Sequence, residues 1–198
     1  MTVATAPAKQ TSATIRTRFH KLIMSKGRAK AIELMAADAM GAWMYALDYD
    51  KPLEPEHQLM LTTLMNEQLS VRDAMIAVTL DPDLLGGEVM QLASHPHQPD
   101  NRKRITEILT AAFMDAAFRP DTDRLTNAAA IMLQAANDAD GKTSCQPLAT
   151  AAYCAWLAGD MKAATLLAAT ALGIDEETNL ACIVLYAIEH NDKPAYMR

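Results

Sequence analysis

Residues that could bind a metal or activate a substrate are scattered along the chain. His95, His97 and Asp100 form the one cluster of potential metal ligands, within a proline-flanked segment. The two imidazoles have no third and fourth partner at a spacing typical of a metal site. His57 follows Glu56 where a helix is expected to start, and both residue types are ordinary there. We therefore expect no metal, no cofactor and no general base.

Phosphate-binding loops and nucleophiles also lack the companions that they require. Gly141, Lys142 and Thr143 have neither the upstream glycine nor the apolar strand of a P-loop. Ser144 and Cys145 have no histidine arrangement that would make either one a nucleophile. The sequence favours a protein that is not an enzyme.

Arg72 and Asp73 are the most informative polar pair in an apolar stretch. We expect Ser70 to cap a helix here, with Asp73 at its positive end. Arg72 would then pair with a carboxylate from a neighbouring helix. In the alternative reading, Arg72 lines a site for a partner or ligand.

Positive charge is concentrated near the beginning of the chain. Residues 1–32 carry a net charge of +7 with no acidic residue, whereas the remainder carries −13. We favour two roles for such a segment: it can dock on the acidic part of its own chain, or it can bind a protein partner. It could also bind nucleic acid through its phosphates, but the acidic remainder of the chain would repel nucleic acid. The candidate partner-binding residues are Arg16, Arg18, Lys21, Lys26, Arg28, Lys30 and Arg72.

The composition favours an all-α fold. The chain is 51% hydrophobic and 5% aromatic, with Ala, Leu and Met as its main apolar residues, and these three favour helices. Residues 1–11 are small and polar and predict a disordered tail, whereas 12–198 predict a single helical domain built as a compact multi-helix bundle. Apolar spacing of three to four residues predicts helices that include 28–48, 71–80, 84–93, 125–136 and 178–189.

The remaining composition bears on location and assembly. No run approaches eighteen apolar residues, and no segment resembles a cleaved leader, so we expect a cytoplasmic protein without a membrane partner. Cys145, Cys154 and Cys182 lie in alanine-rich helical contexts and are expected to be buried thiols. The chain has 13 methionines and many alanines, and an exposed stripe of them could pair two copies into a homo-oligomer.

The C-terminal part carries two resemblances. Gly159-Asp160, Ala164, Ala171-Leu172 and Asp175 resemble one tetratricopeptide hairpin, without a second copy. A longer run is similar to the C-terminal end of the actinobacterial and actinophage family of unknown function numbered 4192. That run comprises Ala155-Trp156, Gly159-Asp160, Ala163-Ala164, Ala171-Leu172, Asp175, Leu180-Ala181, Ile183-Val184, Ala187-Ile188, Pro194 and Arg198, and Arg72-Asp73-Ala74 extends it upstream.

Two features depart from that family. Its members usually begin with a longer α/β portion, which nothing strand-like replaces here, and Asn191 stands where the family has a glycine. The resemblance implies a helical protein of an actinobacterium or of its phage. With the missing catalytic motifs, it leads us to expect a protein-interaction or regulatory factor, for which a host protein is a candidate partner. A DNA-associated accessory protein that uses the basic segment is the alternative.

Overall fold

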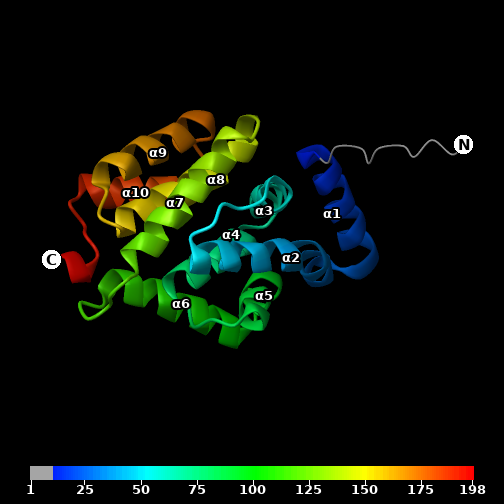
Figure 1. Ribbon diagram of the computed structural model, residues 1–198, viewed down its shortest axis with the longest axis horizontal. Helices are drawn as coiled ribbons and strands as arrows, with labels where there is room; N and C mark the ends of the chain where they lie inside the picture. Colours follow the sequence, from blue (N-terminus) through cyan, green and yellow to red (C-terminus); the bar gives the residue numbers. More distant parts are fainter. Residues whose placement is uncertain (1–10) are drawn as a thin grey trace, which may run out of the picture.

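The computed structural model describes residues 11–198 and shows only helices in that range, ten α-helices and two short 3₁₀-helices (Figure 1). The all-α fold class is therefore confirmed. The first half contains α1 (Ser12–Lys26), α2 (Arg28–Tyr49), α3 (Pro55–Glu67), α4 (Leu69–Leu80) and α5 (Gly86–Ser94). The second half contains α6 (Pro99–Met114), α7 (Thr122–Asn137), η1 (Gly141–Ser144), α8 (Cys145–Leu157), α9 (Met161–Ile174), α10 (Asn179–Glu189) and η2 (Ala195–Met197).

Local chemistry explains where several helices begin. Pro55 and Pro99 occupy the first helical positions of α3 and α6, where a missing N–H costs nothing. Asp121 and Asp160 accept hydrogen bonds from the first-turn amides of α7 and α9. Thr11 caps α1 in the same way, so it belongs to the folded part. The rest of the predicted tail, 1–10, lies outside the described residues.

Helix α8 forms the centre of the molecule. It packs against α7, α9 and α10 on one side and against α3 and α4 on the other, as Figure 1 shows. Every one of its residues except Gln146 is buried. A helix that is apolar on all sides needs such an interior position. One continuous core therefore contains residues of all ten α-helices.

The predicted C-terminal hairpin is present as α8 and α9, with α10 packed against both. Gly159 turns the chain between the two helices with a φ of 91°, a conformation that side chains disfavour. Ala164, Ala168 and Ala171 of α9 are fully buried. Their small side chains let the helix axes approach closely. The likeness to a tetratricopeptide repeat stays a resemblance.

Two local predictions are wrong. Gln68, not Ser70, is the N-cap of α4, because the Ser70 Oγ donates to the carbonyl of Ala93 at 2.7 Å. Cys145 and Cys154 are buried as expected, but Cys182 is exposed. It lies on the outer face of α10, since α8 and α9 cover the opposite face.

None of the helices within 11–198 is long and apolar enough to cross a membrane.

Candidate basic interaction surface

The basic segment is helix α1 together with the start of α2. Ile15 and Phe19 on the inner face of α1 are fully buried and hold this helix against α2 and α3. Arg16 and His20 lie one turn apart and reach the same carboxylate, Glu67 at the end of α3. The Arg16 Nε lies 2.5 Å from Oε1 and the His20 Nε2 lies 2.7 Å from Oε2.

The environment of Glu67 favours its charged form. Burial is the largest influence and raises its pKa, but the hydrogen bonds from His20 and Arg16 and their charge together outweigh burial. The pKa of Glu67 is therefore held below the usual carboxyl value. This part of the basic segment docks on the protein's own chain, as one of the predicted alternatives requires.

The outer side of the same segment is free of carboxylate partners. Arg18, Lys21, Lys26 and Arg28 are exposed, and none forms an ion pair within residues 11–198. Lys30 differs, because its Nζ lies 2.8 Å from Glu33 on the same helix. We call Arg18, Lys21, Lys26 and Arg28 the basic surface.

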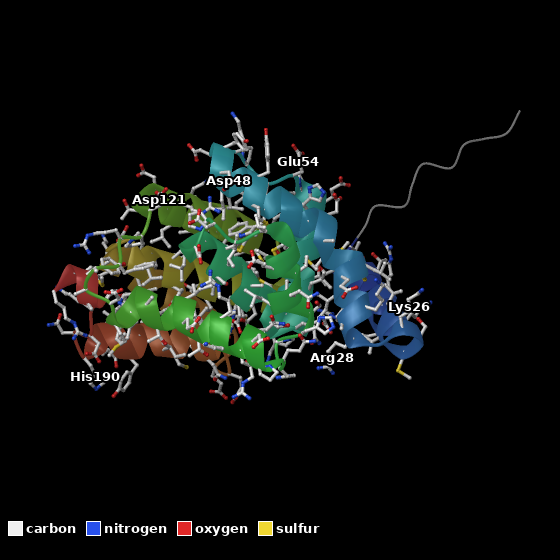
Figure 2. All side chains as sticks on the ribbon, turned by 90° about the horizontal axis from the view of Figure 1, so that it is seen from below. Lys26, Arg28, Asp48, Glu54, Asp121 and His190 are labelled. Carbon is white, nitrogen blue, oxygen red and sulfur yellow. The ribbon has the colours of Figure 1, made fainter. Side chains whose placement is uncertain are left out.

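The corner between α1 and α2 brings the ends of the basic surface together. Gly27 sits between Lys26 and Arg28 with a φ of 83°, where a side chain would strain the backbone. Figure 2 shows Lys26 and Arg28 at the end of the molecule formed by α1, whereas Asp48, Glu54 and Asp121 lie along another edge. Lys26 and Arg28 therefore lie away from these three carboxylates.

An apolar side chain also stands on the exposed side of α1. Met24, between Lys21 and Lys26 in sequence, is 88% exposed. A flexible thioether among cations is suited to a surface that offers both carboxylates and apolar atoms. Sequence reasoning missed Met24, because a lone methionine in a helical pattern indicates core.

Arg72 lies apart from the basic surface and is only 8% exposed. Its Nη2 lies 2.7 Å from Asp73 on its own helix, and its Nη1 donates to the Gln146 side chain of α8 at 2.8 Å. The expectation of a carboxylate from a neighbouring helix is wrong, because an amide fills that role. Arg72 therefore bonds to partners within its own chain, and it forms no contact with the candidate partner-binding cations of α1 and α2 among the described hydrogen bonds and ion pairs.

The other candidate ligands and nucleophiles form no metal site or activated nucleophile among the described residues. Within 11–198, no three His, Cys, Asp or Glu side chains gather as a metal site would require. The Ser144 hydroxyl donates to the Gly141 carbonyl at 2.7 Å. Burial is the main reason that the pKa of the Cys145 thiol is raised, which disfavours the reactive thiolate. His95 and His97, by contrast, line a cleft beside Arg28.

A second exposed region is apolar. Leu166 of α9 and Ile183 and Tyr186 of α10 are exposed large side chains on neighbouring helices. The predicted homo-oligomer could use such a surface. It stays a prediction, because nothing in the structure shows what covers these side chains.

Fold and surface together define an all-α helical protein with an exposed basic surface. A scan against protein-family models found no match, and searches of curated proteins and of solved structures found none either. The likeness to the family numbered 4192 therefore stays a prediction from the sequence.

Proposed function

We propose that this protein is a non-enzymatic interaction or regulatory factor whose basic surface binds an acidic partner protein. In line with the sequence resemblance, the proposal places it in the cytoplasm of an actinobacterium or with its phage, and a host protein is the candidate partner. The observation that carries the proposal is a set of exposed cations on α1 and α2 that have no carboxylate partner within residues 11–198, namely Arg18, Lys21, Lys26 and Arg28.

Two features favour a protein partner. Met24 offers an exposed apolar contact within the cationic side of α1, and protein surfaces supply apolar pockets that a phosphate backbone lacks. The charge on the rest of the chain is strongly negative, so a large polyanion such as DNA would be repelled beyond the basic surface. An acidic patch on a protein can be small enough to avoid this repulsion.

Nucleic-acid binding is the second candidate. Arg18, Lys21 and Lys26 all lie on one helix, and such a row of cations can follow a phosphate backbone. Nuclease treatment distinguishes the two candidates, because it removes bound nucleic acid and leaves a bound partner protein in place.

The test is affinity capture with the full chain as bait in a lysate of the source cells, with and without nuclease. We compare wild type with a charge-reversed basic surface and with a matched control that reverses three exposed lysines elsewhere. The test variant is Arg18→Glu/Lys21→Glu/Lys26→Glu, and the control is Lys51→Glu/Lys162→Glu/Lys193→Glu.

We expect one protein to be enriched by wild type and by the control but lost with the test variant. Its retention should fall as salt rises from about 50 to 200 mM, because screening weakens contacts between exposed charges. Nuclease should change nothing. Loss of all bound material after nuclease supports the DNA alternative, and equal capture by all three baits refutes a role for the basic surface.

A further inference from the structure

A cleft lies beside the basic surface, between the start of α2 and the loop from α5 to α6. Its volume is about 520 Å³, within the range of small-molecule pockets. Three separate parts of the chain line it, around residues 28–32, 68–70 and 94–99. The sequence gives no sign of the cleft, because it exists only when these parts meet.

Three helices begin at this cleft. Arg28 and Ala29 open α2, Gln68 and Ser70 surround the start of α4, and Gln98 and Pro99 surround the start of α6. No side chain caps the first-turn amides of any of the three. The first-turn amides at each of these helix starts can donate hydrogen bonds to an anion.

Three side chains with basic nitrogen line the same cleft. Arg28 presents a guanidinium group, which binds phosphate oxygens in a forked geometry. His95 and His97 add imidazole rings from the α5–α6 loop. The guanidinium, the imidazoles and the helix N-termini come from separate elements, and all favour an anion at one place.

The hydrogen bonds of Ser94 fix how His95 meets the cleft. The Ser94 Oγ donates its one proton to the Met90 carbonyl at 2.6 Å, so it accepts from the Nδ1 of His95 at 2.9 Å. The proton of a neutral His95 ring is therefore on Nδ1, away from the Nε2. The His95 Nε2 forms no hydrogen bond within residues 11–198 and is the ring nitrogen left for a ligand.

Three carboxylates lie close to the cleft in sequence or in space, and Glu67, next to the lining residue Gln68, is paired with Arg16 and His20. Glu33 lies near His95 but forms an ion pair with Lys30. The hydrogen bond from Lys30 is the main reason that the pKa of Glu33 is lowered. Asp100 in the first turn of α6 lines a neighbouring hollow with Arg104. None of the three carboxylates lines the cleft itself.

We propose that this cleft binds the phosphate monoester group of a small organic molecule. The phosphate lies against Arg28, His95 and His97, and the uncapped helix starts donate amide hydrogen bonds. The cleft is larger than a phosphate ion, and Ala29, Ile32, Pro96 and Pro99 form apolar walls for the rest of the ligand. The cleft shares Arg28 with the basic surface, but its other lining residues lie outside that surface, so the two sites can be tested separately.

Titration of the full chain, followed by amide NMR shifts and calorimetry, tests the proposal. The ligands are inorganic phosphate, adenosine 5′-monophosphate and a short phosphoserine peptide, with adenosine as the uncharged control. We expect the monophosphate to bind more tightly than phosphate and to shift amides of residues 28–30, 68–70 and 95–101. Binding of the peptide alone would overturn the small-molecule assignment.

Substitutions separate this site from the partner surface. Arg28→Gln and His95→Gln should each weaken monophosphate binding about tenfold, because each removes a charge-assisted hydrogen bond. Arg18→Gln removes the same charge as Arg28→Gln from a position outside the cleft and should leave that affinity unchanged. Equal effects of the Arg18 and Arg28 variants would show non-specific charge attraction and overturn the site.

Ala29→Glu gives a test with two opposite effects. It places a carboxylate in the first turn of α2, which has no acidic residue there. The helix dipole should stabilise this carboxylate and raise the melting temperature, so loss of binding could not be blamed on unfolding. The same carboxylate should lower monophosphate affinity more than tenfold. Unchanged affinity in this folded variant would refute the cleft as the site.

Discussion

Arg124 of α7 forms an ion pair with Asp48 of α2, with 2.6 Å between Nη1 and Oδ1. Its Nη2 also donates to the carbonyl of Val78 in α4 at 3.1 Å. Arg124 is only 7% exposed, and its Nε has no partner in the described chain. One side chain therefore joins three helices that are distant in sequence.

Truncation of Arg124 should destabilise the protein. We expect Arg124→Ala to lower the free energy of unfolding by about 2 kcal/mol, because it removes buried contacts and leaves a carbonyl unpaired. Arg124→Met should cost less, since it keeps the apolar stem and removes the unpaired Nε. Urea unfolding measures both, with Lys162→Ala on the surface as the control. Equal stability of wild type and Arg124→Ala would contradict this role.

The acid dependence of stability should change when Glu67 is neutralised. Its folded pKa is lowered by His20 and Arg16 despite burial, so its carboxylate stabilises the fold above the unfolded carboxyl value of about 4.3. This contribution is lost as pH falls through the lower folded pKa. Glu67→Gln should therefore be less stable than wild type near pH 7.

The difference between wild type and Glu67→Gln should shrink as the pH is lowered below the folded pKa. Urea unfolding over a pH series measures it, and Glu176→Gln serves as an exposed control outside the ion pairs. If the difference in the free energy of unfolding stayed constant across the pH series, the effect of Glu67→Gln would not come from the lost negative charge.

Close packing in the α8–α9 hairpin predicts contrasting effects at adjacent alanines. Ala168 is fully buried and Ala169 is exposed on the same helix. Ala168→Leu should lower the free energy of unfolding by about 2 kcal/mol, because the helices must separate to admit the larger side chain. Ala169→Leu should change it by less than about 0.5 kcal/mol. Thermal melts of both variants decide whether the hairpin is packed this tightly.

Thiol reactivity should distinguish the three cysteines. Burial raises the pKa of Cys154 to about 12 and also raises that of Cys145, whereas Cys182 is exposed. A thiol reagent should label one cysteine per native chain and all three after denaturation. Cys182→Ser should abolish the native labelling. Rapid labelling of Cys154 in the native chain would contradict its burial.

Helix positions were predictable from the sequence because they depend on local signals. Gly27, Pro55 and Gly159 each interrupt a period of three to four, and the structure ends or begins a helix at each of them. Such signals act within a few residues and need no knowledge of the partner helix.

The pairing of side chains was not predictable, because it depends on which helices meet. Arg72 finds the Gln146 amide, 74 residues away, instead of a carboxylate. Ser70 bonds to Ala93 across a helix contact instead of capping its own helix. The site was predicted only in part. The cations of α1 were identified, but the adjoining cleft needs His95 and His97 beside Arg28.

The central position of α8 has a consequence for how the chain matures during synthesis. Asn66 of α3 donates to the carbonyl of Thr143 just before α8, and Arg72 of α4 bonds to Gln146 within it. The ribosome therefore releases α3 and α4 long before the helix that completes their core exists. We expect the emerging first half to fold late and to need protection from aggregation until α8 is inserted.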